Sequence, residues 1–317
     1  MTTRHVLTIA TLLLAGCTER NDSKPPSGAA RPASSTATLA EARRGFTPRI
    51  THPQPPGQPA TEPPGEVFRL VKYDAPVGKL SAYLSPIPQD GTKHAAIIWI
   101  TGGDCNTIDE VWTDAPPDND QTAGAYRKAG LIMMFPSLRG GNDNPGAKET
   151  LFGEVDDVLA ARDFLAKQDG IDPARIYLGG HSTGGTLALL AAEMSDKFRA
   201  IFSFGPVDNV AGYGQKLLTF DVNDRRELEL RAPILWLASV KSPTFVFEGT
   251  GGNLASLQMM AQTSTNPLLH FHPVTGADHF SILAPLNGLI ARKILADSGP
   301  SLNVSFDPQE LNGLFAR

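Results

Sequence analysis

Residues 176–185 read Ile-Tyr-Leu-Gly-Gly-His-Ser-Thr-Gly-Gly and contain the pentapeptide G-x-S-x-G, from Gly180 to Gly184. An apolar, strand-like stretch leads into the pentapeptide, and the small and aliphatic residues 186–192, which favour a helix, follow it. Glycines on both sides of a serine allow a sharp strand-to-helix turn that leaves the serine strained and exposed. The helix behind the turn offers backbone N–H groups to a developing negative charge. This stretch therefore predicts that Ser182 is a nucleophile.

Between residues 66 and 297 the sequence alternates segments that favour strands with segments that favour helices. The strand-like segments are 66–73, 78–84, 95–100, 131–135, 175–178, 200–204, 244–247 and 268–274. Helical spacing marks 152–168, 253–262 and 282–295. Strands that alternate with helices pack as a mainly parallel sheet with helices on both faces. We therefore expect an α/β fold in which the first two strand segments form a hairpin.

The first 17 residues have the layout of an export signal. Arg4 and His5 precede an apolar core, residues 6–14, which is too short to span a bilayer. The small residues before Cys17 resemble the lipobox of bacterial lipoproteins. The resemblance implies that Cys17 carries a lipid and anchors the protein at the periplasmic or cell-surface face of a membrane, the outer membrane if the source is Gram-negative. A plain cleaved signal peptide is the alternative.

Composition divides the rest of the chain into three parts. Residues 18–65 are rich in Pro, Ser, Thr, Ala and Gly, which predicts a disordered tether. The remainder suits one globular domain, 66–297, and a C-terminal tail, 298–317. The net charge is −5 with acidic and basic residues interspersed, so no nucleic-acid partner is expected, and the sequence carries no signal for an oligomeric state. A lipid on Cys17 would leave Cys105 as the only other cysteine, so no disulfide is expected.

Four segments of the domain carry recognisable motifs. They are the strand and glycines at 98–103 (Ile-Trp-Ile-Thr-Gly-Gly), the approach to the serine at 171–182, the strand at 243–249 (Pro-Thr-Phe-Val-Phe-Glu-Gly) and the loop at 276–280 (Gly-Ala-Asp-His-Phe). Together they resemble the α/β-hydrolase superfamily, and most closely the catalytic domain of prolyl oligopeptidases and the dienelactone hydrolase-like esterases. The resemblance implies an α/β-hydrolase fold with a small cap or none, and a serine hydrolase that uses a serine, a histidine and an acid.

A serine hydroxyl is a weak nucleophile until a neighbouring base takes its proton, so we expect a histidine from elsewhere in the chain to act as the base. His270, His272 and His279 follow Ser182. His279 lies in a loop after the last strand segment, where the Ser–acid–His order of these hydrolases places the base. His270 and His272 alternate along that strand and face the same side, as a pair of metal ligands would. No third ligand is evident, so no metal site is predicted.

The acid is the point at which the sequence departs from the family that it resembles. The loop after strand 244–247 usually carries an aspartate, and Gly252 stands at that position here. Glu248 ends the strand just before the loop, Asp208 follows an earlier strand, and Asn253 would orient the imidazole without a charge. Glu248 is the preferred candidate, because its longer side chain offsets its earlier position. The absence of any acid is also left open.

The oxyanion hole is expected to combine the backbone N–H groups of Gly103 and Thr183. No metal ion and no organic cofactor is implied. The sequence thus predicts an exported serine hydrolase of small-molecule esters or amides, or of short peptides, in which Ser182 attacks and His279 transfers the proton. The alternative is a degenerate, non-catalytic lipoprotein with a hydrolase fold that binds a ligand or partner, which the missing aspartate favours.

Overall fold

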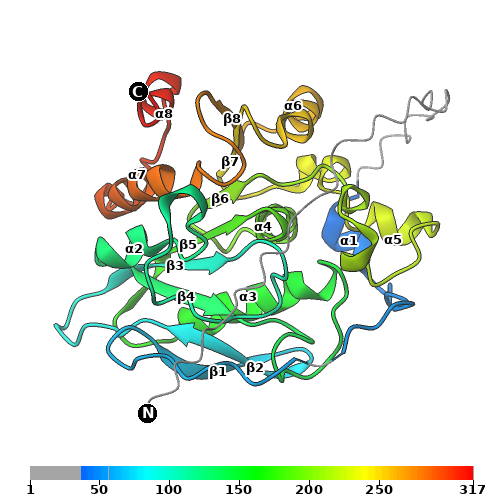
Figure 1. Cartoon of the computed structure of the whole chain (residues 1–317), viewed down its shortest axis with the longest axis horizontal. Coiled ribbons are helices and arrows are strands. Elements are labelled where there is room, and N and C mark those ends of the chain that lie inside the picture. The colour runs from blue at the N-terminus through cyan, green and yellow to red at the C-terminus, as the bar shows by residue number, and fades with distance from the viewer. Residues whose placement is uncertain (1–36, 56, 317) are drawn as a thin grey trace, which may run out of the picture. The chain divides into compact units, whose positions relative to one another are not determined.

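An eight-stranded sheet runs through the part of the chain that the computed structural model describes, residues 37–55 and 57–316 (Figure 1). Its strands are β1 (Arg69–Ala75), β2 (Gly78–Leu84), β3 (His94–Ile100), β4 (Ile132–Pro136), β5 (Ile171–His181), β6 (Ile201–Phe204), β7 (Thr244–Gly249) and β8 (Leu269–Val274). They pair in the order β1-β2-β4-β3-β5-β6-β7-β8. Strand β2 is antiparallel to both of its neighbours, and all other pairs are parallel. The mainly parallel sheet and the initial hairpin predicted from the sequence are confirmed.

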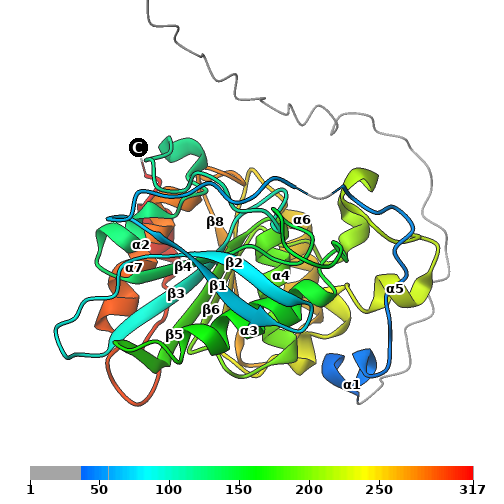
Figure 2. The same ribbon diagram turned by 90° about the horizontal axis from the view of Figure 1, so that it is seen from below.

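Helices cover both faces of the sheet, as Figure 2 shows with α2 and α7 on one side and α3 and α4 on the other. One face packs against α3 (Gly153–Leu165), α4 (Thr183–Met194) and α6 (Leu254–Thr263), and the opposite face packs against α2 (Gly124–Lys128), α7 (Leu283–Ala296) and α8 (Pro308–Gly313). The central strand β3 shows the pattern, since Ala96, Ile98 and Ile100 join the first cluster and Ala95, Ile97 and Trp99 join the second. Within the described residues, every helix is too short or too polar to traverse a bilayer.

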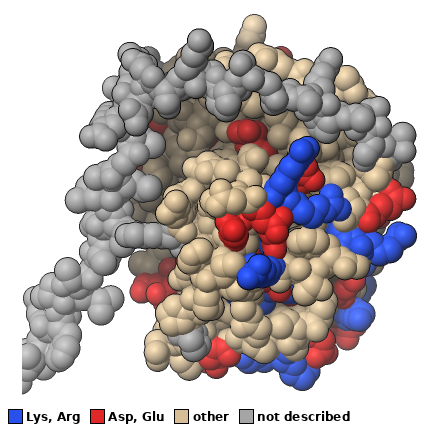
Figure 3. All heavy atoms as spheres, turned by 90° about the vertical axis from the view of Figure 1, so that its right-hand side faces the viewer, with Lys and Arg blue, Asp and Glu red and all other residues tan. Residues whose placement is uncertain are grey.

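Short helical turns fill the connections between these elements. They are α1 (Leu39–Arg43), η1 (Pro117–Asn119), η2 (Val210–Gly212), η3 (Gln215–Leu217), α5 (Arg225–Glu229), η4 (Pro233–Leu235) and η5 (Leu237–Ser239). Figure 3 looks onto the side of the molecule where α1 and α5 lie, and acidic and basic side chains stand next to one another there. Arg225 and Arg226 both pair with Glu229, with N···O distances of 2.6 and 3.6 Å. Acidic and basic side chains on this side therefore pair with one another.

The carboxyl ends of the parallel strands bring together the segments that carry the candidate site residues. Loop 101–105 follows β3, Ser182 follows β5, Asp208 follows β6, Glu248 lies at the end of β7 and His279 follows β8. Parallel strands end at one edge of the sheet, which is where ligands bind in open α/β sheets. The fold therefore gathers these residues at one edge.

Residues 37–65 are ordered against the domain, with Pro56 outside the described residues. Helix α1 begins with a capping box, in which Thr38 and Glu41 bond reciprocally to each other's backbone N–H groups. The Leu39 side chain is fully buried, and the Leu39 N–H donates to Ser239 Oγ at 3.1 Å. Arg43 binds Asp156 at 3.0 Å. These contacts hold α1 on the surface that α4 and the following turns form.

The prediction of a disordered tether over residues 18–65 is therefore wrong for 37–55 and 57–65, and residues 18–36 lie outside the described part of the chain. Proline-rich composition argues against regular structure, but it does not prevent an extended segment from lying on a core that it did not form. A few apolar side chains suffice here, as Leu39 and the single β-bridge between Ile50 and Phe220 show.

Leu39→Ala is expected to lower the free energy of unfolding by about 2–4 kcal/mol, because it removes a fully buried side chain and leaves a cavity. Urea unfolding of the two proteins measures the difference. Leu295, which is 45% exposed, provides the matched control, and its change to alanine should cost less than about 1 kcal/mol. A loss of less than about 0.5 kcal/mol for Leu39→Ala would mean that α1 does not dock.

The C-terminal tail packs against the loop that carries His279. Leu311 of α8 is 1% exposed, and Asn312 Oδ1 accepts a hydrogen bond from the Thr275 N–H at 2.9 Å. A Cβ at Gly276 would lie 3.1 Å from Phe315 Cβ, so the tail approaches this loop closely. The predicted tail thus supports one of the loops of the candidate site.

Candidate active site

Ser182 stands at a sharp turn between β5 and α4. Its backbone has φ 53° and ψ −113°, a conformation that costs free energy for a residue with a side chain. A Cβ at Gly184 would lie 2.6 Å from the Thr101 O, so only glycine lets the helix start this close to the segment after β3. The strand–turn–helix geometry expected from the sequence is present, and it exposes the serine at the sheet edge.

His279 and Glu248 meet at the carboxyl ends of the paired strands β7 and β8. His279 Nδ1 lies 2.9 Å from Glu248 Oε2, and the other carboxylate oxygen, Oε1, accepts the Gly249 N–H at 2.8 Å. Glu248 is 1% exposed, while the His279 side chain retains 16% exposure. The carboxylate is therefore buried, hydrogen-bonded on both oxygens and directed at one ring nitrogen of the histidine.

The two other acid candidates lie elsewhere in the described structure. Asp208 Oδ1 accepts a hydrogen bond from Ser256 Oγ at 2.6 Å, and the Asp208 backbone O accepts the Ile234 N–H. Asn253 is the N-terminal capping residue of α6. Of the three candidates from the sequence, Glu248 is the one with a hydrogen bond to the His279 ring.

Two glycines make room for this pair. A Cβ at Gly252 would lie 2.5 Å from Glu248 Oε1, so no side chain fits at this position while the carboxylate occupies its site. Gly205, with φ +57°, would place a Cβ 2.6 Å from His279 Nδ1 and 2.9 Å from Glu248 Oε2. Glycine at 252, where an aspartate was expected, therefore leaves the space that the Glu248 carboxylate occupies.

The segment after β3 lies directly against the serine. A Cβ at Gly102 would stand 3.3 Å from Ser182 Cβ, and Thr183 Oγ1 donates to the Gly103 O at 2.8 Å. Gly103 has φ +73°, and within the described residues neither its N–H nor that of Thr183 has an acceptor. Two free donors beside the serine suit an oxyanion.

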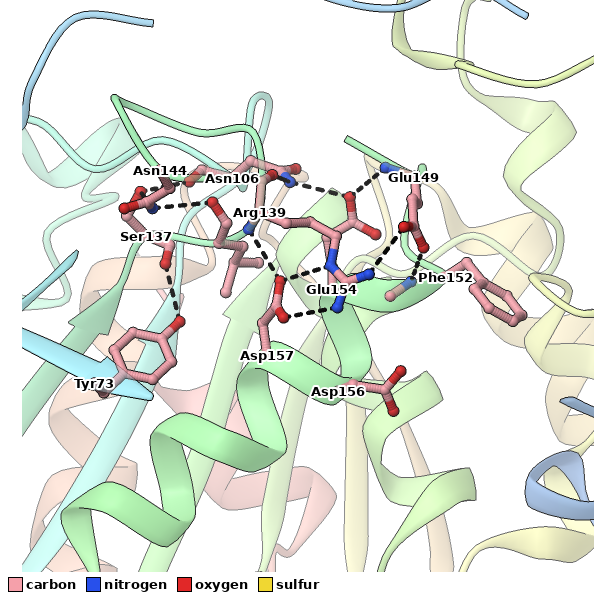
Figure 4. Close-up of polar contacts among 12 residues, drawn as sticks. Tyr73, Asn106, Ser137, Arg139, Asn144, Glu149, Phe152, Glu154, Asp156 and Asp157 are labelled. Carbon is pink, nitrogen blue, oxygen red and sulfur yellow. Dashed lines mark hydrogen bonds and ion pairs between the residues drawn. The ribbon is translucent and has the colours of Figure 1, made fainter. Parts of the chain in front are cut away.

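A buried polar network, shown in Figure 4, fixes the chain just beyond these glycines. Asn106 Nδ2 donates to the Arg139 O at 2.8 Å and to Glu154 Oε1 at 3.0 Å. The Arg139 guanidinium in turn binds Asp157 through two bonds of 2.8 and 2.9 Å and binds Glu149 at 2.9 Å. Burial raises the pKa of Glu154. These bonds tie the chain after Gly102 and Gly103 to the start of α3.

A cavity of about 180 Å³ opens beside the two free N–H groups. Gly103 and Thr183 form part of its wall, together with Cys105, Tyr213 and Gln54 of the N-terminal segment. Burial raises the pKa of the Cys105 thiol, so this side chain is neutral. The Tyr213 hydroxyl bonds to the Thr186 hydroxyl at 2.6 Å. Cys105 and Tyr213 therefore give this part of the wall neutral side chains, whereas Asp104 and Lys148 line it as an ion pair.

Matches to known proteins agree with this geometry. Residues 119–233, which include Ser182, match the model of the prolyl oligopeptidase family. The dual function macrocyclase-peptidase of Galerina marginata is 33% identical over 106 residues, which are 32% of this chain and 14% of that protein. The chain thus corresponds to a small part of this relative. The family match supports serine hydrolase activity in the broad sense.

Solved structures extend the likeness to most of the described chain. The puromycin-hydrolyzing peptidase of Mycobacterium tuberculosis has a TM-score of 0.58 at 19% identity, over 75% of this chain and 40% of that one. The Pyrobaculum calidifontis esterase has a TM-score of 0.53 at 16% identity, over 74% and 86%. The fold is that of the α/β hydrolases. The chain spans less than half of this peptidase's length.

His270 and His272 of β8 pack against phenylalanines of the neighbouring strand β7. His270 stacks on Phe245 with ring centroids 5.0 Å apart, and His272 stacks on Phe247 at 5.2 Å. Burial lowers the pKa of His272 to about 4. In the described residues no group of three or more His, Cys, Asp or Glu side chains is arranged to hold a metal ion.

Sequence reasoning missed one polar residue of this candidate site, Gln121. It follows η1 and lies between Gly102 and His181, the residue before Ser182. The available signal was His181 itself, since a buried polar ring beside the serine needs partners. Cys17, the predicted lipid site, lies outside the described residues.

Proposed function

We propose that the protein is a serine hydrolase that cleaves carboxylic esters or amides, with Ser182 as nucleophile, His279 as base and Glu248 as the acid that orients the base. The observation that carries the proposal is the 2.9 Å contact between His279 Nδ1 and Glu248 Oε2. A buried carboxylate on one ring nitrogen fixes the tautomer that leaves the other nitrogen free to accept a proton.

The proposed reaction follows from the positions of these groups. Ser182 Oγ attacks the substrate carbonyl carbon while His279 Nε2 takes the hydroxyl proton. The carbonyl oxygen becomes an oxyanion that the N–H groups of Gly103 and Thr183 stabilise. The imidazolium then donates its proton to the leaving oxygen or nitrogen, and the Ser182 ester is hydrolysed by a water that His279 activates in the same way. The Glu248 carboxylate orients the ring and stabilises the imidazolium.

The cavity beside the oxyanion donors supports a limit on the substrate. Its volume of about 180 Å³ suits a short acyl or side-chain substituent rather than a long chain. Lys148 and Asp104, which also line it, bind each other at 2.7 Å. Because this pair is neutral as a whole, we expect an uncharged substituent on a small-molecule ester, amide or short peptide.

A fluorophosphonate probe tests this function, because it reacts with serines that a neighbouring base activates. The folded protein should form one covalent adduct, and peptide mass spectrometry should locate it on Ser182. Heat-denatured protein is the control and should not react. Folded protein that stays unlabelled, while a reference serine hydrolase in the same tube reacts, would argue against catalysis.

We further propose that a lipid on Cys17 anchors the enzyme to a membrane, as the residues before this cysteine indicate. Cys17→Ser should move the protein from the membrane fraction to the soluble fraction, because serine has no thiol to acylate. Ester hydrolysis per folded molecule should stay within about 2-fold, since the change lies outside the catalytic domain. Thr18→Ala keeps the thiol and should leave the protein on the membrane. Membrane retention of Cys17→Ser would refute the anchor.

A further inference from the structure

We propose that Gln121 and His181 form a positioning pair. The pair connects Gly102 and Gly103, the segment that carries one proposed oxyanion donor, to the loop that carries His279, the proposed base. The proposal rests on the function given above, because the groups that the pair connects are those of the proposed reaction. Neither side chain reaches the reacting atoms in this role. They act by holding Gly103 and His279 in register with Ser182.

Gln121 forms the first half of the connection. Its Oε1 accepts the Gly102 N–H at 3.0 Å, and its Nε2 donates to His181 Nδ1 at 2.8 Å. The residue is itself held in place, because its backbone O accepts from Trp99 Nε1 at 3.2 Å and its amide also donates to Asn119 Oδ1 at 2.8 Å. A fixed amide thus joins the backbone before Gly103 to an imidazole.

His181 forms the second half. Its Nε2 lies 2.9 Å from the His279 O, and its ring packs against the His279 ring with centroids 4.5 Å apart. His181 is 1% exposed. Since a carbonyl oxygen only accepts, Nε2 carries the hydrogen, and the Gln121 amide can then donate to the lone pair on Nδ1. The Nε2–H tautomer of His181 satisfies both contacts. In this form His181 holds the backbone carbonyl of His279, the proposed base.

The charge state of His181 fits the same role. Burial, and then the neighbouring charge of His279, lower the pKa of His181 to about 3. A neutral ring is required here, because a cation 4.5 Å from the His279 ring would oppose the positive charge that His279 gains during the reaction. Gln121 brings no charge of its own, so the connection positions the base without changing its electrostatics.

Nuclear magnetic resonance of protein labelled with ¹⁵N-histidine tests the geometry in the unaltered enzyme. The His181 ring should appear as the neutral Nε2–H tautomer and should not titrate between pH 5 and pH 8. A His181→Asn spectrum assigns the signal. An Nδ1–H tautomer, or a titration within this range, would overturn the proposal.

Kinetics of two variants test the positioning role. Gln121→Leu removes the bonds to Gly102 and His181 together with the one to Asn119, and Gln121→Glu keeps the acceptor for Gly102 but loses the donor to His181. Each should lower kcat by about 10–100-fold and leave KM within about 2-fold, because a misplaced base affects the transition state more than substrate binding. Gln168→Leu is the control, since Gln168 is also half-buried and, within the described residues, its side chain bonds only to the Phe164 O. It should keep the wild-type kcat.

The outcomes separate this proposal from the proposed function. Equal kcat values for Gln121→Leu, Gln121→Glu and Gln168→Leu would reject the positioning pair while Ser182 labelling continued to support the hydrolase. If Gln121→Leu does not fold, Gln121→Glu and the spectrum of the unaltered enzyme decide the matter. If the wild-type protein lacks a Ser182 adduct and hydrolyses nothing, the proposed function itself fails.

Discussion

Ser182→Ala is expected to lower kcat for ester or amide hydrolysis by about 10⁶-fold and to abolish the fluorophosphonate adduct. The serine oxygen forms the covalent bond to the acyl group in the proposed reaction, so no neighbouring side chain replaces it. Initial rates with a chromogenic short-chain ester measure the effect. The fold should survive, because alanine removes one partly exposed oxygen at the turn.

Two comparisons make this result specific. Ser256→Ala removes a hydroxyl that bonds to Asp208 rather than to the candidate site, and it should change kcat by less than about 2-fold. The thermal unfolding midpoint of Ser182→Ala should lie within a few degrees of the wild-type value, a shift as small as that caused by a typical surface substitution. If Ser182→Ala still hydrolyses the ester at a tenth of the wild-type rate, Ser182 is not the nucleophile.

The elements that place the site follow from sequence because their signals are local. Each buried strand is a short apolar run, and the helices repeat apolar residues at helical spacing. The turn at Ser182 is recognisable because glycines flank it on both sides and a strand and a helix adjoin it. Glu248 was preferred over Asp208 and Asn253 because of the family resemblance, in which the loop after the strand corresponding to β7 carries the acid. These inferences needed no knowledge of long-range contacts.

The remaining parts of the site depend on contacts between distant segments. Gln121 bonds to Gly102 and His181, which lie 19 and 60 residues away in the chain. Nothing in the composition around Gln121 indicates that its amide bonds to Gly102 and His181. The docking of Leu39 is similar, because its hydrogen-bond partner Ser239 is 200 residues away. Local patterns predict elements, while such side-chain partners appear only when the chain is folded.

The glycine at 252 shows how one departure from a family pattern can be read in two ways. From sequence, an empty position in the acid loop favoured a protein without catalysis. In the folded chain the Glu248 carboxylate fills the space that a side chain at 252 would need, with 2.5 Å between its Oε1 and a Cβ there. A side chain at 252 and the Glu248 carboxylate therefore exclude each other sterically, so the missing aspartate does not by itself favour a protein without catalysis.

Glu248→Gln is expected to lower kcat by about 10⁴-fold with a small change in KM. The amide is nearly the same size and can still contact His279 Nδ1, but its orientation no longer specifies which ring nitrogen carries the proton, and it does not stabilise the imidazolium. Steady-state kinetics with the same ester separate kcat from KM. Unfolding in urea shows whether the variant is folded, which matters because Glu248 is buried and also accepts the Gly249 N–H.

Asp208→Asn is the matched control for this prediction, since it makes the same chemical change at the other carboxylate that the sequence offered. Asp208 accepts from Ser256 Oγ at 2.6 Å, and an amide oxygen can accept this bond equally well, so kcat should stay within about 2-fold. Loss of activity in Asp208→Asn with full activity in Glu248→Gln would transfer the role of the acid to Asp208. If both variants match a wild-type protein that hydrolyses no ester and binds no fluorophosphonate, the contact between Glu248 and His279 is structural, and a non-catalytic role for the hydrolase fold follows.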